Sequence, residues 1–322
     1  MKRRAIVWLC ETTGKSILKL TDEDYNKNGL SDLLALEGSS YDLNINMFNH
    51  FQNTVTGWPG GKPGADDSTR PERKSPNSKR VIIFSPHPDD DVVSMGGTFD
   101  RLVSQGHEVH IAYQVKGNIA VSDHDALKFI EVSKDMFKND SKVPVSQLIK
   151  ELVNNKSDKI DSQAVRDLKG FIRKREAIAA TRYIGIPDSN THFMNLPFYN
   201  TGRIKKNPPT KKDVLITASL IKKIKPHQIF AAGDLEDPHG THKVCLDVIL
   251  DALDILKGEK FIKDCWLWLY RGAWLDWDVH DIDMAVPMSP AQVLRKRKAI
   301  FFHQTQKDGV MFQGQDLSLI HI

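Results

Sequence analysis

The sequence predicts an α/β fold in which a mostly parallel sheet is flanked by helices, with a short extension at the N-terminus. Three observations support this prediction. From residue 81 onward, short apolar runs alternate with segments of helical periodicity. Hydrophobic residues make up 40% of the 322 residues and charged residues 27%, which is enough apolar material for a sizeable core. Polar clusters directly follow two of the apolar runs, as is typical of the loops at one edge of a parallel sheet.

The expected elements follow one another along the chain from residue 81. A buried strand is a short run of β-branched or aromatic residues, whereas a helix repeats its apolar residues every three to four positions. The strands are expected at residues 81–84, 108–115, 227–233 and 265–270. The helices are expected at residues 92–105, within 123–183, and at 243–256 and 289–303. Gly96 and Gly97, inside the first of these helices, are expected to let that helix approach a strand closely.

Composition divides the chain into four stretches. Residues 60–80 hold Gly, Pro, Ser and charged residues without a large apolar side chain, which predicts a flexible linker. Residues 1–59 form a separate extension before it, and residues 81–316 form the main domain after it. The last stretch, LSLIHI at 317–322, does not continue the preceding pattern, and we interpret it as a non-native tail.

Composition also argues against several classes of protein. The net charge of +4, without an aromatic and basic platform, argues against a nucleic-acid-binding module. No apolar run approaches the ~20 residues of a membrane span, and AIVWLC at 5–10 is too short for the core of a secretory signal. The three cysteines form no CxxC pair, and so sparse a set suits a reducing compartment. We therefore expect a cytoplasmic protein, and no feature of the sequence predicts an oligomeric state.

Two polar segments carry the chemistry that the sequence predicts. SPHPDDD at 85–91 follows the first expected strand, and GDLEDPHGTH at 233–242 begins as the third one ends. Parallel strands present such loops at the same edge of the sheet, where ligands bind. Three adjacent carboxylates repel one another, and a bound dication would offset that repulsion. The supply of His and Asp exceeds the three protein ligands of a catalytic zinc site, which leaves groups for general acid and base catalysis.

The same two segments resemble the (A/P)HPDDE motif and the His-x-x-His motif of the PIG-L/LmbE-like N-deacetylases. The resemblance implies a Rossmann-like, LmbE-like fold and zinc-dependent removal of an acetyl group from N-acetylglucosamine-type groups. It implies that the metal ligands are His87, Asp90 and His242, that Asp89 is the general base, and that His239 assists the tetrahedral intermediate. Such a His₂Asp site also accepts iron or cobalt. Asp91 stands where the family usually has Glu, which puts in doubt a hydrogen bond made by the longer side chain.

Further segments concern the amino-sugar substrate. Residues 172–186 resemble the R-x-x-E helix of the family, which implies that Arg173 binds the sugar, with Arg175 as the alternative. KGN (116–118) resembles a Gly-containing turn that lines the pocket in the family, which makes Asn118 a second candidate for binding the substrate. His303, in FFHQTQ (301–306), either approaches the pocket or packs as a surface histidine. The basic segment 203–212 is interpreted as a solvated surface loop, and the alternative is that it favours an anionic substrate.

Residues 1–59 resemble the segment that joins two modules in a bacterial fusion protein. In that protein a glucosamine-6-phosphate deaminase-like module precedes an LmbE-like domain, so we expect covalent fusion to such a module. Two alternatives to a deacetylase remain open at this point. The domain could regulate or partner a fused deaminase, or it could hydrolyse another bond, such as a phosphoester. The latter reaction is typical of sites with two metal ions and more carboxylate ligands.

Overall fold

A computed structural model describes residues 1–55, 78–136, 145–154, 160–203, 205–274 and 277–306. The chain divides into two compact units. One unit consists of Met1–Pro59 together with Asp276–Met288, and the other of Gly60–Leu275 together with Ser289–Ile322. The predicted linker lies outside the described residues except for residues 78–80, and the predicted non-native tail at 317–322 lies wholly outside them.

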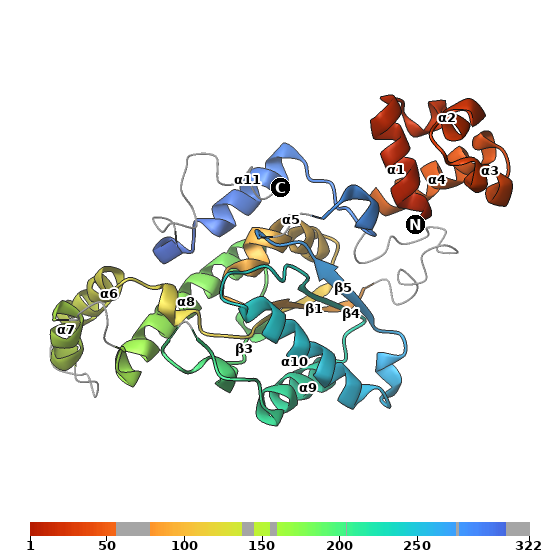
Figure 1. The fold of residues 1–322 in the computed structure, drawn as a ribbon. Coiled ribbons are helices and arrows are strands. Elements are labelled where there is room, and N and C mark those ends of the chain that lie inside the picture. Colours follow the sequence, from red (N-terminus) through yellow and green to blue (C-terminus); the bar gives the residue numbers. More distant parts are fainter. Residues whose placement is uncertain (56–77, 137–144, 155–159, 204, 275–276, 307–322) are drawn as a thin grey trace. The chain divides into compact units, whose positions relative to one another are not determined.

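The larger unit is built on a parallel sheet of five strands (Figure 1). The strands are β1 (Arg80–Ser85), β2 (Glu108–Tyr113), β3 (Thr191–Phe193), β4 (Gln228–Ala232) and β5 (Trp266–Tyr270), in the order β3-β2-β1-β4-β5. All four strand pairs are parallel, with Val81 of β1 opposite Val109 of β2 and Gln228 of β4. The chain therefore runs outward from β1 to β3 and then returns to the other side of β1. This reversal between β1 and β4 is where open α/β sheets bind their ligands.

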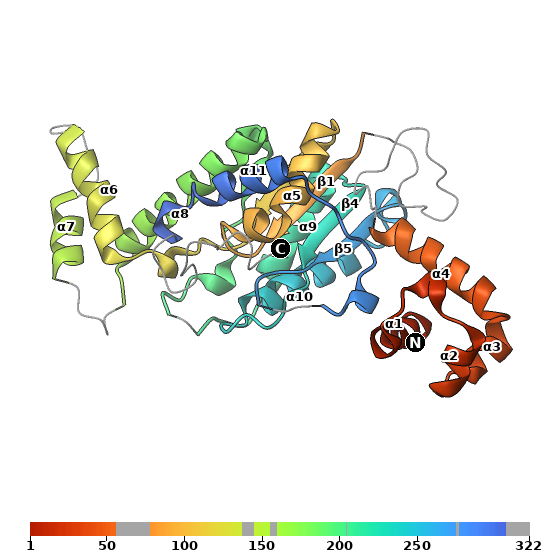
Figure 2. The same ribbon diagram turned by 90° about the horizontal axis from the view of Figure 1, so that it is seen from above.

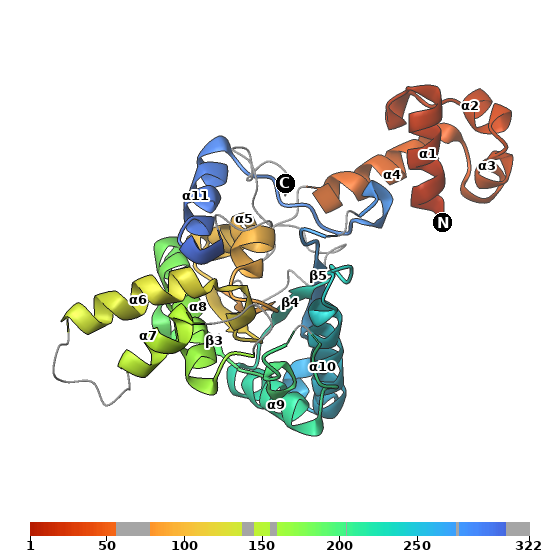
Figure 3. The ribbon, with the colours of Figure 1, turned by 60° about the vertical axis from the view of Figure 1, so that its left-hand side comes forward.

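Helices cover both faces of this sheet (Figures 2 and 3). One face carries α5 (Asp90–Ser104), α8 (Gln163–Ile184) and α11 (Pro290–Ile300), and the other carries α9 (Lys211–Ile224) and α10 (Thr241–Leu256). The side chains of β1 alternate between two cores, because successive residues of a strand point to opposite faces. Val81 and Ile83 pack with the first group of helices, whereas Ile82 and Phe84 pack with the second. These layers confirm the predicted α/β fold.

One strand and one α-helix of the larger unit were not predicted. Strand β3 has only three residues, THF, which is too short for an apolar run to stand out. Helix α9 begins at Lys211, inside the basic segment interpreted as a loop, because Thr210 and Asp213 form a capping box at its N-terminus. The expected helical stretch within 123–183 contains α6 (Asp123–Met136), α7 (Val145–Val153) and most of α8. Across the described residues, no helix combines the length and apolar character needed to cross a membrane.

The smaller unit is helical. It contains α1 (Lys2–Thr13), α2 (Asp22–Lys27), α3 (Ser31–Glu37) and α4 (Ser40–Val55). Its core is formed by Ile6, Leu9, Leu20, Tyr25, Leu43 and Met47. Residues 276–288, which the sequence analysis assigns to the 81–316 domain, are grouped with this unit. A hydrogen bond contributes to this grouping, because the guanidinium of Arg3 in α1 donates to Asp283 Oδ1 over 2.9 Å.

Gly96 permits a close contact between two helices on the same face of the sheet. A Cβ at this position would lie 2.8 Å from Lys296 Cγ of α11. The expectation that Gly96 serves a helix–strand contact is therefore wrong for this residue, because α11 covers this side of α5. The contact matters for the site, since α5 begins at the loop that carries the first polar segment.

We expect Gly96→Val to lower the free energy of unfolding by about 1–3 kcal/mol, because the added atoms would push α11 away from α5. Chemical denaturation followed by circular dichroism measures this change. The matched control is Gly258→Val, where nothing lies within 4 Å of the position of a Cβ. Equal stability of the two variants would contradict the close packing of α5 against α11.

Candidate metal centre and active-site cavity

The first polar segment forms the turn between β1 and α5. Strand β1 ends at Ser85 and α5 begins at Asp90, so His87 and Asp89 lie in the turn between them. The backbone N–H of His87 donates a hydrogen bond to Asp90 Oδ2 over 2.7 Å. Pro88 fixes its own backbone φ angle within this turn. Three consecutive aspartates thus lie at the start of a helix, where the helix dipole stabilises negatively charged carboxylates.

Asp91 anchors this turn to the sheet. Its carboxylate is fully buried and accepts a hydrogen bond from the Tyr113 hydroxyl of β2 over 2.8 Å. Its backbone N–H donates to Ser85 Oγ over 3.1 Å. Burial raises the pKa of Asp91 to about 7, although the Tyr113 hydroxyl opposes that rise. The shorter side chain found in place of Glu therefore still has hydrogen-bond partners, and they lie within the sheet.

The second polar segment forms the turn between β4 and α10. The Asp237 carboxylate accepts hydrogen bonds from the backbone N–H groups of Thr241, over 2.8 Å, and His242, over 3.0 Å. These are the first residues of α10, so Asp237 satisfies two of the N–H groups that a helix leaves free at its start. The His242 ring donates from Nδ1 to the Asp234 carbonyl over 3.0 Å. This bond fixes the tautomer of His242 and leaves its Nε2 available as a ligand.

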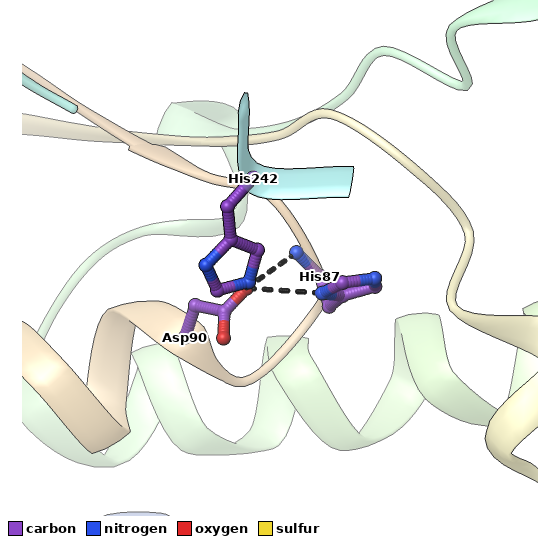
Figure 4. A group of neighbouring side chains, drawn as sticks. All are labelled: His87, Asp90 and His242. Carbon is purple, nitrogen blue, oxygen red and sulfur yellow. Dashed lines mark hydrogen bonds and ion pairs between the residues drawn. The ribbon is translucent and has the colours of Figure 1, made fainter. Parts of the chain in front are cut away.

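The two turns meet at three side chains (Figure 4). Asp90 Oδ2 lies 3.2 Å from His87 Nδ1 and 3.3 Å from His242 Nε2. One potential ligand atom from each residue lies within 4.8 Å of the other two. The structure thus brings together the three residues that the sequence analysis proposes as metal ligands. Two imidazole nitrogens and one carboxylate oxygen are a donor set that suits zinc and other divalent transition metals.

The charges around His242 favour a cation. Burial disfavours a charged imidazole, but the carboxylates of Asp90, Asp237 and Asp234 outweigh burial and raise the pKa of His242 to about 9. Burial also disfavours the Asp90 carboxylate, yet the facing imidazoles of His242 and His87 lower its pKa well below the usual range. A metal ion would replace the proton on His242, and the same carboxylates would stabilise its positive charge. The residues therefore fit a divalent metal by donor chemistry and by charge.

Asp89 and Arg173 form a buried ion pair beside these residues. Arg173 Nη2 of α8 donates to Asp89 Oδ1 over 2.8 Å, and only 1% of Arg173 is exposed. Burial raises the pKa of Asp89, although the guanidinium opposes that rise. Among the described residues, Arg173 Nε and Nη1 have no hydrogen-bond partner. Gly117, at φ 62°, allows this approach, because a Cβ there would lie 2.9 Å from Pro88 and 3.3 Å from Arg173.

These side chains open into a cavity of about 350 Å³. His87, Asp89, Asp90 and Arg173 line it, and exposed His239 lines it from the second turn. The cavity has further lining residues that the sequence did not single out, among them Tyr199, Ala273, Trp274 and Gln306. The first three belong to no motif, and only the fold brings them to the cavity. Gln306 ends the FFHQTQ segment, of which only His303 is named as a candidate. Lys206 also lines the cavity, from the basic segment that the sequence analysis treats as solvated.

The remaining predicted residues lie around this cavity in different ways. Asn118 is buried and is not among the residues that line the cavity, whereas its neighbours Gly117 and Ile119 are. Arg175, the alternative to Arg173, is exposed and is likewise not a lining residue. His303 is fully buried rather than at the surface, and neither ring nitrogen has a partner among the described residues.

Glu176, the acidic residue of the R-x-x-E segment, makes its hydrogen bonds with Thr305 and not with Arg173. Its carboxylate accepts hydrogen bonds from the Thr305 backbone N–H over 2.8 Å and from the Thr305 hydroxyl over 2.9 Å. The arginine and the glutamate of the R-x-x-E segment therefore contact different parts of the chain. Arg173 faces the first turn, whereas Glu176 holds the chain that follows α11.

Several known proteins resemble this chain. A glucosamine-6-phosphate deaminase-like protein of Bacteroides thetaiotaomicron is 53% identical over 323 residues, which cover 98% of this chain and 49% of the relative. The chain thus spans about half the length of that protein. Among solved structures, an N,N'-diacetylchitobiose deacetylase from Pyrococcus horikoshii has a TM-score of 0.46 and 17% identity, with 76% of each chain covered. A 4-carboxy-2-hydroxymuconate hydratase from Pseudomonas putida has a TM-score of 0.42 and 16% identity, covering 76% of this chain and 82% of its own. At this level of similarity the solved structures say nothing of the reaction.

A family model identifies the chain. The model described as PIG-L, GlcNAc-PI de-N-acetylase, matches residues 82–253, which is more than half of the sequence. The matched range contains both polar turns and all three residues of the candidate metal centre. This match confirms the resemblance drawn from the two motifs, and the chain belongs to the PIG-L (GlcNAc-PI de-N-acetylase) family.

Proposed function

We propose that this chain is a metal-dependent hydrolase that removes the N-acetyl group from an amino sugar of N-acetylglucosamine type, or from a conjugate of one. The observation that carries the proposal has two parts. His87, Asp90 and His242 form one group of potential metal ligands, and His87 and Asp90 of this group line the same cavity as a further carboxylate, Asp89. A purely structural metal site needs no such extra carboxylate. Membership of a de-N-acetylase family supports the same reaction.

His87, Asp90 and His242 would hold the metal, with zinc as the first candidate and iron or cobalt as alternatives. When bound, such an ion supplies a Lewis acid for the acetyl carbonyl and lowers the pKa of a water molecule toward neutrality. The Asp234 carbonyl keeps His242 Nε2 free for this role. Asp237 supports the same histidine through its backbone.

Asp89 is suited to act as the general base. Arg173 holds one of its carboxylate oxygens, so the other is free to accept a proton from the attacking water. Its burial makes the carboxylate a stronger base than an exposed aspartate. The same proton then passes to the leaving amine, so that acetate and the free amino sugar are the products. Arg173 orients Asp89 and lines the cavity, whereas Asn118 is not a lining residue, so contact with the sugar fits Arg173 better than Asn118.

His239 is suited to stabilise the oxyanion. It lines the cavity from the second turn, three residues before the proposed ligand His242, and it is exposed to solvent. A protonated imidazole there would donate a hydrogen bond to the acetyl oxygen as negative charge develops on it. Its exposure also leaves it free to exchange its proton with solvent between turnovers.

A second candidate function is that of a regulatory or partner module for a fused deaminase. The relative's name and the fact that this chain spans about half of its length favour this alternative. Under it, the cavity would bind a metal or a sugar, but the chain would release no acetate. An assay of acetate release therefore separates the two functions.

We expect Asp89→Asn to retain the metal but to reduce the rate of acetate release by roughly 10²- to 10⁴-fold, because the variant lacks the general base. An assay of acetate release from a panel of N-acetylated amino sugars, with metal content measured in parallel, checks this. An Asp89→Asn variant that releases acetate at the wild-type rate would contradict the role of Asp89.

We expect His242→Ala to lose both the metal and activity, because it removes one of three ligands. Metal content after dialysis, measured by elemental analysis, is the direct test. His124→Ala is the control, since His124 is an exposed residue of α6 and should leave both unchanged. Full metal occupancy in His242→Ala would show that His242 is not a ligand.

We expect His239→Ala to retain the metal and to lower kcat by roughly 10²- to 10³-fold, as the loss of an oxyanion donor does. Steady-state kinetics and metal analysis of the same preparation check this. Loss of the metal from His239→Ala would instead make His239 a ligand.

A further inference from the structure

Lys206 places an ammonium group in the wall of the active-site cavity. Lys206 is half-buried and lies in the segment between η5 (Pro197–Tyr199) and α9. The ends of this segment are held together, because Asp213 of α9 accepts a hydrogen bond from the Phe198 backbone N–H over 3.0 Å. The Lys206 ammonium lies 4.0 Å from the centre of the Tyr199 ring and donates to the Arg203 carbonyl over 2.6 Å. These contacts leave part of its hydrogen-bonding capacity free, because an ammonium group has three donors.

Within the described part of the chain, Lys206 has no carboxylate partner. Two other lysines of the same unit that are shielded from solvent do have one: Lys116 pairs with Asp167 over 2.8 Å, and Lys169 pairs with Asp123 and Asp161. Burial lowers the pKa of Lys206 to about 8, and no neighbouring anion offsets that change. Arg173 also lines the cavity, but its guanidinium is already paired with Asp89. Lys206 is thus a cation in the wall of the cavity, and none of the residues that the structure describes provides it with a counterion.

Lys206 lies near the proposed metal centre but does not belong to it. The Tyr199 ring lies close to both: its centre is 6.2 Å from the centre of the His87 ring, and the Lys206 ammonium lies 4.0 Å from the same Tyr199 centre. The ammonium is therefore no farther from the centre of the His87 ring than the sum of these two distances. A hexose that carries a substituent is long enough to span a gap up to this upper limit. A sugar whose acetamido group faces His87 could therefore reach Lys206 with another group.

We propose that Lys206 binds an anionic group on the substrate, so that the substrate class is an N-acetylated amino sugar bearing a phosphate or a carboxylate. The choice of reaction rests on the function proposed above, whereas the recognition of the anion rests on Lys206 and the cavity. A charge-assisted hydrogen bond in a partly desolvated site supplies both affinity and specificity. A purely structural alternative exists, in which Lys206 only holds its loop against Tyr199 through a cation–π contact.

Matched substrates separate recognition of an anion from a structural role. The full-length metal-loaded chain is assayed with N-acetylglucosamine, its 6-phosphate, and the carboxylate-bearing N-acetylmuramic acid. We expect kcat/KM to be higher for at least one anionic substrate than for N-acetylglucosamine, and the better anion identifies the group. In Lys206→Met, which keeps an unbranched side chain, we expect the ratio of anionic to neutral kcat/KM to fall by roughly 10- to 100-fold.

Two further variants sharpen this test. Lys206→Arg should restore most of the ratio, because it restores the charge. Lys205→Met, at an exposed neighbouring lysine outside the cavity lining, should leave the ratio unchanged. An equal loss for neutral and anionic substrates in Lys206→Met would overturn the proposal and assign Lys206 a structural role. A wild-type chain that prefers the neutral sugar would overturn it as well.

A binding measurement distinguishes failure of this inference from failure of the proposed reaction. If the wild-type chain releases acetate from no substrate, the deacetylase function fails, and calorimetric titration with glucosamine, glucosamine 6-phosphate and muramic acid still tests Lys206. We then expect wild type to bind at least one anionic sugar more tightly than glucosamine, and Lys206→Met to lose that difference. Equal or undetectable binding of all three ligands to wild type would overturn the inference.

Discussion

The site depends on how three adjacent carboxylates are accommodated where β1 ends. Asp89, Asp90 and Asp91 follow one another, and their mutual repulsion would oppose folding unless each charge met a different environment. Asp89 pairs with the guanidinium of Arg173. Asp90 faces two imidazoles. Asp91 accepts a hydrogen bond from Tyr113 in the sheet, with its pKa raised to about 7. One residue type at three successive positions thus supplies the proposed base, a proposed metal ligand and an anchor to the sheet.

The fold supplies each of these environments from a different part of the chain. Strand β4 lies next to β1, so the turn that follows β4 brings His242 to Asp90. Helix α8 crosses the same face of the sheet as α5 and brings Arg173 to Asp89. Strand β2 pairs with β1 on the other side and brings Tyr113 beneath Asp91. The position of β1 in the middle of the sheet is therefore what allows the three carboxylates to have three partners.

Much of this arrangement can be predicted from the sequence, and the exceptions have physical reasons. The four longer strands are apolar runs, and His87, Asp90 and His242 lie in motifs directly after two of them, so topology alone brings them to one edge. Strand β3 was missed because three residues carry no periodicity. Helix α9 was missed because its basic first turn hid the capping signal of Thr210 and Asp213.

Contacts between residues far apart in the sequence could not be predicted either. Arg173 is 84 residues from Asp89, and no spacing rule relates them. Tyr199, Lys206 and Trp274 belong to no motif and become cavity residues only through the fold. Asn118 is the converse case. It lies in a motif, yet it is buried and is not a lining residue, whereas its neighbours Gly117 and Ile119 line the cavity, so its contact with the substrate stays a prediction.

A metal ion held by both turns would unite the site, and a crystal structure of the metal-loaded chain with anomalous scattering data would locate it. We expect one anomalous peak about 2.0–2.2 Å from ligand atoms of His87, Asp90 and His242. Asp278, His280 and Asp281 form a second, largely exposed group of potential ligands in the smaller unit. A peak only at that second group, or no peak between the two turns at full metal loading, would show that His87, Asp90 and His242 do not form a metal centre.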